Sequence, residues 1–167
     1  MSVIHTLAVS RLLIVVSLSV SESVFETGDT QDHFIGYHDG YRRLKDPVLH
    51  EREIRFDKQQ LEFVIDDCLN CKGRHKVERF FHFSEHCRVE LAHDGLNVFN
   101  NGSFVEISPM QPGCRIDLHY GDETLPLGWT SRHYDSKTPS YSAVFRDDIT
   151  GTTCLQTSIR IHPNVSK

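Results

Sequence analysis

Hydrophobic and polar residues alternate along most of this chain with a period of two. In one run, Leu61, Phe63 and Ile65 share one side of an extended chain, and Glu62 and Asp66 share the other. The same alternation recurs in later runs, at 77–83, 116–120 and 141–145. Because successive side chains of a strand point to opposite faces, this pattern predicts half-buried β-strands rather than amphipathic helices.

Turn signals separate these runs. Asp94-Gly95 and Asn101-Gly102 supply the positive φ angles that tight hairpin turns require. Short strands at such spacing predict an all-β, antiparallel domain, either a sandwich or a barrel. We place this domain at residues 35–163, and leave 1–34 as an N-terminal segment of uncertain structure.

The first residues of the chain support two interpretations. Arg11, an apolar run from Leu12 to Val16 and the small residues that follow are typical of a secretory signal peptide within residues 1–23. The interrupted alternation through Leu18 and Val20 instead indicates a strand of the domain itself. The apolar run is too short for a membrane-spanning helix, so we expect no membrane span.

Net charge limits the classes of partner. The chain of 167 residues has the length of one domain, a formal net charge of −5 and a pI of about 6.1. No global basic field therefore draws it to nucleic acid or to an anionic membrane, and we expect no nucleic-acid partner.

Cys68-x-x-Cys71 followed by His75 suggests a zinc site. If residues 59–68 and 75–83 pair as a hairpin, Cys68 and His75 oppose each other and Cys71 lies in the turn. A fourth ligand is the difficulty, because His82 lies roughly 23 Å farther along the strand and on its other face. We therefore expect no metal ion and no cofactor.

The five cysteines are too few and too irregular for a disulfide framework. Their odd number leaves at least one thiol unpaired, and the pairing of the others cannot be read from the sequence. A single bridge is compatible with an oxidising compartment.

Several motifs follow one another in a characteristic order: HDGYRRL (38–44), PVLHERE (47–53), VIDD (64–67), GRH (73–75), HFS (82–84) and GWTSRHYDSKTPSYSAVF (128–145). This order resembles the C-terminal β-sandwich region of heparinase II/III-like proteins. The resemblance extends over about residues 36–161, and it selects the antiparallel β-sandwich as the expected fold.

The resemblance also implies a function. Family members are polysaccharide lyases that cleave uronic-acid glycans by β-elimination, with a Tyr/His pair moving protons and a polar group neutralising the uronate carboxylate. The family's helical α/α-toroid carries the catalytic tyrosine, and a His-rich segment before HDGY carries the catalytic histidine and metal ligands. Residues 1–35 match no such segment, so we assign no catalytic and no metal residue.

The resemblance therefore identifies the chain as the C-terminal sandwich portion of a lyase, inactive by itself and completed by a toroid domain in the same or another chain. It implies a periplasmic or secreted location and an acidic polysaccharide as ligand. The alternative is a non-catalytic glycan-binding module.

Aromatic rings and arginine forks near residue 40 are the candidate substrate-binding groups, because rings stack on pyranose faces and guanidinium groups hold carboxylates or sulfates. They are Tyr37, His38, Tyr41, Arg42 and Arg43. A structural interpretation competes: Asp39 and Gly40 form a turn, with Gly40 at positive φ. We expect His50, Arg52 and Arg79 to be solvated or paired with Glu51, Glu53 or Glu78.

Overall fold

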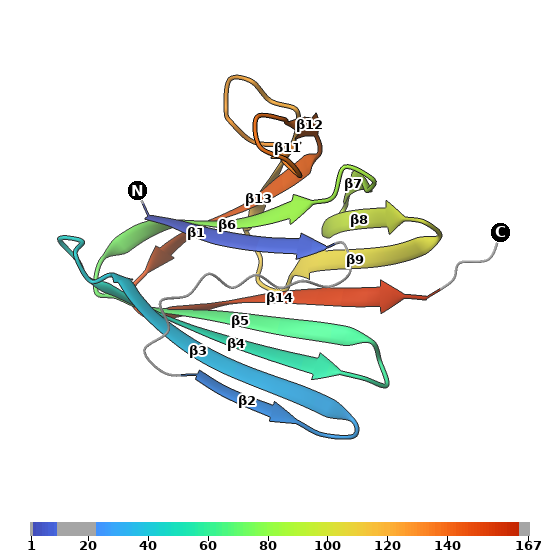
Figure 1. Cartoon of the computed structure of the whole chain (residues 1–167). Helices are drawn as coiled ribbons and strands as arrows, with labels where there is room; N and C mark the ends of the chain where they lie inside the picture. Colours follow the sequence, from blue (N-terminus) through green and yellow to red (C-terminus); the bar gives the residue numbers. More distant parts are fainter. Residues whose placement is uncertain (1, 10–22, 164–167) are drawn as a thin grey trace.

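Two facing β-sheets form the domain in the computed structural model, which describes residues 2–9 and 23–163 (Figure 1). The larger sheet has the strand order β2-β3-β4-β5-β14-β9-β8-β7, and the smaller sheet the order β1-β6-β13-β10. A separate two-stranded ribbon, β11-β12, extends from the smaller sheet. No helix occurs in the described residues, and the predicted all-β antiparallel sandwich is confirmed.

The strands are β1 (Ser2–Val9), β2 (Ser23–Thr27), β3 (Gln31–Tyr41), β4 (Val48–Asp57), β5 (Glu62–Asn70), β6 (Arg74–Phe83), β7 (Arg88–Ala92), β8 (Gly95–Asn100), β9 (Ser103–Pro109), β10 (Arg115–Tyr120), β11 (Trp129–Thr130), β12 (Thr138–Pro139), β13 (Tyr141–Thr150) and β14 (Thr153–His162). Neighbours pair antiparallel, except that β1 runs parallel to β6.

The core lies between the inner faces of the two sheets. Phe63 and Ile65 of β5 face Phe81 of β6 and Phe145 of β13, and all four side chains are buried. Burying an apolar side chain of this size stabilises a fold by about 1.5–3 kcal/mol. The alternation that the sequence shows is thus the alternation between core and surface.

Two of the predicted turns can be compared directly with the structure. Asn101 and Gly102 both have positive φ and connect β8 to β9, as predicted. Gly95 instead follows the turn and begins β8, where an added Cβ would lie 2.2 Å from the carbonyl oxygen of Ile107. Glycine is required there by close approach of another strand.

The predicted hairpin of residues 59–68 and 75–83 is wrong. Strand β5 pairs with β4 and β14 in the larger sheet, whereas β6 pairs with β13 and β1 in the smaller one. The link of residues 71–73 therefore crosses from one sheet to the other. Both strands keep their apolar face on the core by this route, so alternation alone could not distinguish it from a hairpin. Cys68 and His75 are consequently not cross-strand neighbours.

One disulfide joins the two adjacent strands β5 and β14, between Cys68 and Cys154. Cys68 is therefore not available as a zinc ligand in the oxidised protein. The remaining cysteines are thiols.

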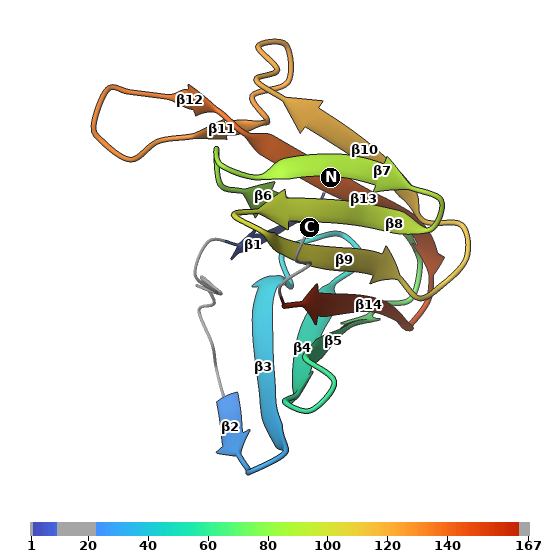
Figure 2. The same cartoon turned by 90° about the vertical axis from the view of Figure 1, so that its right-hand side faces the viewer.

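The N-terminal segment contributes strands β1 and β2 to the sheets. The alternation through Leu18 and Val20 and most of the proposed signal sequence lie outside the described residues. Within the described ranges, no helix has the length and hydropathy to cross a bilayer. Figure 2 shows the β2-β3 hairpin projecting beyond the smaller sheet, and Phe25 on β2 is 68% exposed.

Candidate functional site: the basic end of the sandwich

Three chain connections meet at one end of the sandwich, on the left of Figure 1. The β3-β4 loop and the β5-β6 link lie at the same end because Leu49, near the start of β4, pairs with Asn70, the last residue of β5. The β13-β14 turn joins them through a hydrogen bond from the Gly151 N–H to the Gly73 carbonyl oxygen, 2.9 Å long.

Basic residues gather on two of these connections and at the start of β6. We call this surface the basic end and define it by the exposed side chains of Arg42, Arg43, Lys45, Lys72, Arg74 and Lys76. Arg42 has a carboxylate neighbour, with its Nε 4.0 Å from Asp39 Oδ2.

The other members of the basic end have no ion-pair partner among the described residues. In that part of the chain, Arg115 is the one other Lys or Arg without such a partner; the rest all pair with carboxylates. Unneutralised cations on one surface of an otherwise acidic protein create a local positive potential that attracts anions. The net charge of −5 gives no indication of this local cluster of positive charge.

The candidate residues of the sequence analysis do not share one face. Tyr37 pairs with Glu51 on the outer face of the larger sheet, whereas His38 pairs with His50 and points inward. Adjacent residues of a strand must diverge in this way. The His38 ring lies 4.8 Å from the Tyr41 ring, centroid to centroid. Arg42 and Arg43 are the two that belong to the basic end.

The turn around Gly40 is confirmed, but its expected positive φ is wrong. The Arg42 N–H donates to the Asp39 carbonyl oxygen at 2.9 Å, and the Gly40 N–H donates to His38 Nδ1 at 3.1 Å. A register shift between His38 and Tyr41 absorbs the turn within β3, so Gly40 does not enter the left-handed region. Burial, and then the charges of His50 and Arg52, lower the pKa of His38.

A buried charge cluster lies behind this turn. Asp67 Oδ1 is 2.7 Å from His50 Nε2 and 2.6 Å from Arg52 Nε, and the three residues are 2%, 3% and 6% exposed. Burial alone would raise the pKa of Asp67, but the Arg52 charge and the His50 hydrogen bond hold it well below its ordinary value. The expectation that His50 and Arg52 are solvated or paired with Glu51 or Glu53 is therefore wrong.

Arg79 is buried in the same manner. Its Nη2 lies 2.9 Å from Asp147 Oδ2, and its Nη1 donates to Thr157 Oγ1 at 2.6 Å. The expected pairing with Glu78 is wrong because residues 78 and 79 lie on opposite faces of β6, and Glu78 pairs with Arg146 instead. These contacts pair the charge of Arg79 and link β6 to β13 and β14, although the buried Nε of Arg79 has no hydrogen-bond partner among the described residues.

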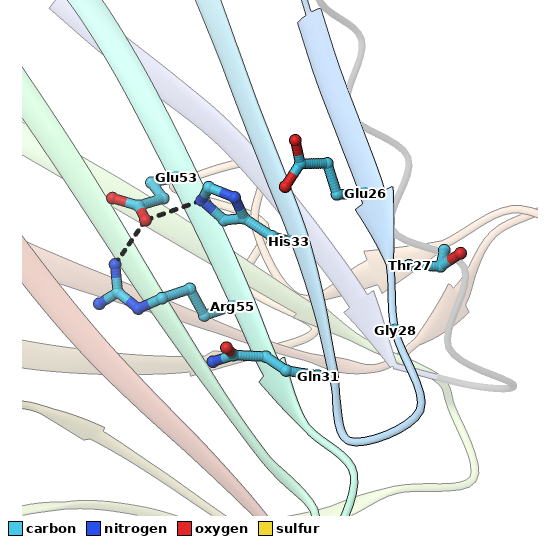
Figure 3. A pocket seen from close by; sticks show the side chains of 7 residues that line it. All are labelled: Glu26, Thr27, Gly28, Gln31, His33, Glu53 and Arg55. Carbon is cyan, nitrogen blue, oxygen red and sulfur yellow. Dashed lines mark hydrogen bonds and ion pairs between the residues drawn. The ribbon is translucent and has the colours of Figure 1, made fainter.

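A shallow groove of 370 Å³ lies on the outer face of the larger sheet (Figure 3). Glu53 Oε1 is 2.8 Å from His33 Nε2 and 2.7 Å from Arg55 Nη1, and Arg55 also pairs with Asp66 at 2.5 Å. The hydrogen bond from Arg55, and then that from His33, lower the pKa of Glu53. Because its charges neutralise one another, this groove is less suited than the basic end to an anionic ligand.

The fold and the basic end define a β-sandwich domain with a local cluster of exposed cations. The family model described as "Heparinase II/III-like, C-terminal" matches residues 9–162, and the chain belongs to this family. No curated protein matches the chain in a sequence comparison.

Two solved structures with a similar fold are a heparan sulfate lyase and a heparinase III. The chain superimposes on heparan sulfate lyase HepC from Pedobacter heparinus with a TM-score of 0.69 at 12% identity, covering 90% of this chain and 23% of that one. It superimposes on a heparinase III, the BT4657 gene product, with a TM-score of 0.67 at 16% identity, covering 88% and 22%. The chain thus spans about a quarter of the length of these structures.

Proposed function

We propose that this domain is the C-terminal sandwich of a polysaccharide lyase that cleaves uronic-acid-containing glycans by β-elimination. The observation that carries the proposal is the family match over residues 9–162. The similar structures, which are a heparan sulfate lyase and a heparinase III, support it through their common fold.

In this proposal the sandwich does not catalyse by itself. β-Elimination requires a base for the C5 proton, an acid for the leaving oxygen and a group that neutralises the carboxylate. We propose that an α/α-toroid domain in the same or another chain supplies the catalytic tyrosine, and that the sandwich completes the cleft. A periplasmic or secreted location follows from the family, and the Cys68–Cys154 bridge supports an oxidising compartment.

The basic end supports a contribution of the sandwich to glycan binding, which is also the function of a non-catalytic binding module. Arg42, Arg43 and Arg74 are exposed guanidinium groups that can hold carboxylates or sulfates through paired hydrogen bonds. Lysines 45, 72 and 76 add charge without fixed geometry. An acidic polysaccharide is the ligand class that this chemistry fits best.

The lyase proposal predicts that the purified chain alone produces no unsaturated uronate from heparin, heparan sulfate or alginate. The measurement is ultraviolet absorbance of the reaction mixture over time, with an active heparinase as positive control. Clear turnover by this chain alone would contradict the proposal that the catalytic groups come from a toroid domain.

The binding proposal predicts that the double variant Arg43→Ala/Arg74→Ala binds immobilised heparin at least about tenfold more weakly than the unaltered chain. Charge-assisted hydrogen bonds contribute about 1.5–3 kcal/mol each, and 1.4 kcal/mol corresponds to a factor of ten. The measurement is equilibrium binding at several salt concentrations, because the affinity should fall as salt rises.

Arg132→Ala/Lys137→Ala is the control for this variant, because it also removes two exposed positive charges, which lie between β11 and β12, outside the basic end, and pair with Glu85 and Glu123. It should bind heparin like the unaltered chain. An equal loss in the control and in the double variant would show that binding depends on total charge and not on the basic end.

A further inference from the structure

Three groups with metal-binding chemistry converge beneath the basic end. They are the carboxylate of Asp46 in the β3-β4 loop, the thiol of Cys71 in the β5-β6 link and the imidazole of His75 in β6. One potential ligand atom from each residue lies within 4.8 Å of the other two. Cys71 is buried, and the other two are partly buried, so the group faces inward from the surface.

Hydrogen bonds already orient the members of this group. Asp46 Oδ2 accepts from the Gly73 N–H at 2.6 Å and lies 2.7 Å from His75 Nε2. The Cys71 thiol donates to the Gly151 carbonyl oxygen at 3.2 Å. The backbone donor to Asp46 fixes the direction of its carboxylate, as supporting hydrogen bonds do for metal ligands. The hydrogen bond of the Cys71 thiol would be lost when the thiolate binds an ion.

From this arrangement we infer that Asp46, Cys71 and His75 form a binding site for a divalent transition-metal ion, with Zn²⁺ preferred. Thiolate, imidazole and carboxylate together match the borderline-soft character of zinc, and calcium and magnesium do not select thiolates. Zinc bonds of about 2.0–2.3 Å would place these ligand atoms about 3.3–3.7 Å apart. Small side-chain movements reach this from the separations in the structure.

The site differs from the one that the sequence suggests. Cys68-x-x-Cys71 and His75 form the expected set, but Cys68 is bonded to Cys154 and Asp46 takes its place. Asp46 lies 25 residues before Cys71 in the chain, and the fold brings the two together at the junction of the two sheets. A water molecule would complete four ligands.

The expected role is structural. The ion would clamp the β3-β4 loop to the β5-β6 link and the start of β6, and these segments together carry the basic end. Burial, and then the neighbouring Asp46, raise the pKa of the Cys71 thiol. Because metal binding releases the thiol proton, the affinity for the metal ion should rise with pH.

Cobalt(II) reports on this site because thiolate ligation produces a near-ultraviolet charge-transfer band and tetrahedral geometry produces visible bands. The chain is stripped with a chelator, keeping the disulfide oxidised, and titrated with Co²⁺ and then with Zn²⁺. We expect a thiolate band that saturates at one Co²⁺ per chain and is displaced by Zn²⁺. Absence of the band would overturn the inference.

Two variants and a control locate the ion. Cys71→Ser should lose the band. Cys114→Ser, which changes a thiol that packs against a different core cluster and is not part of the group around Asp46, should keep it. A band that persists in Cys71→Ser would overturn the assignment. His75→Gln retains a donor to Asp46 and should fold, and we expect its Co²⁺ affinity to fall at least about tenfold; unchanged affinity would also overturn the inference.

The site is independent of the proposed function. The cobalt titration contains no glycan, so its failure would leave the heparin-binding and lyase predictions untouched. Conversely, a chain that binds cobalt but not heparin would contradict the binding proposal alone.

Discussion

Replacing Asp67 with asparagine is expected to destabilise the domain by about 3–5 kcal/mol, because removal of one partner from a buried ion pair leaves the other charge uncompensated. Arg52 and His50 have no solvent to replace the lost carboxylate, since all three side chains are buried. The measurement is the free energy of unfolding from urea denaturation of Asp67→Asn and of the unaltered chain.

Asp66→Asn is the matched control for this prediction. Asp66 is the neighbouring residue on the opposite face of β5, where its carboxylate pairs with Arg55 and accepts from Gln156 at a partly exposed position. Exposed and partly exposed pairs contribute up to about 1 kcal/mol, so the control should lose little. Equal losses in the two variants would contradict the importance of burial at Asp67.

The same residue predicts how stability depends on pH. The pKa of Asp67 is lower in the folded protein than its ordinary value, so the unfolded chain binds a proton first as the solution is acidified. Its contribution is present in full above about pH 5 and is lost progressively below that. Stability of the unaltered chain should therefore fall more steeply below pH 5 than that of Asp67→Asn.

Reduction of the Cys68–Cys154 bridge is expected to remove about 4–5 kcal/mol of stability. The two cysteines are 86 residues apart, and a cross-link over so long a segment restricts the unfolded chain strongly in the chain-entropy model. The measurement is the urea midpoint with and without dithiothreitol.

The double variant Cys68→Ser/Cys154→Ser provides the control for reduction. It should match the reduced protein in stability and should not respond to dithiothreitol, because its remaining cysteines are not bridged. An unaltered chain whose midpoint does not move on reduction would show that the bridge contributes nothing.

The face that each strand buries was predictable from the sequence. Phe63 and Ile65 are buried and Glu62 and Asp66 are not, as the alternation indicates. Strand pairing was not predictable in the same way. A link of three residues between β5 and β6 suits both a hairpin and a crossing between sheets, and the choice depends on partners that lie far along the chain.

The even or odd spacing of residues along β4 would have corrected the expectation that His50 and Arg52 are solvated or paired with neighbouring glutamates. His50 and Arg52 are separated by even numbers of residues from Val48 and Ile54, which are buried, so their side chains had to point into the core. The expected pairing with Glu51 or Glu53 considered only closeness in sequence and ignored the face of the strand on which each side chain lies. Asp67 has the same relation to Phe63 and Ile65.

The site was predictable only in part. Arg42 and Arg43 follow from the HDGYRR motif, but Lys72, Arg74 and Lys76 gain significance only when the fold places the β5-β6 link beside the β3-β4 loop. Asp46 had no signal in the sequence, because its interactions with Gly73 and His75 connect segments that are remote in the chain.

The placement of unpaired cations at one end distributes the charge of the molecule unevenly. Since the whole chain carries −5, the surface away from the basic end is more acidic than that total indicates. The proposed anionic polymer would then be attracted to the basic end and repelled by the acidic parts of the surface, so electrostatics would favour one orientation before any contact forms. Added salt weakens the repulsion and the attraction together, and it should reduce the selection of one orientation as well as the affinity.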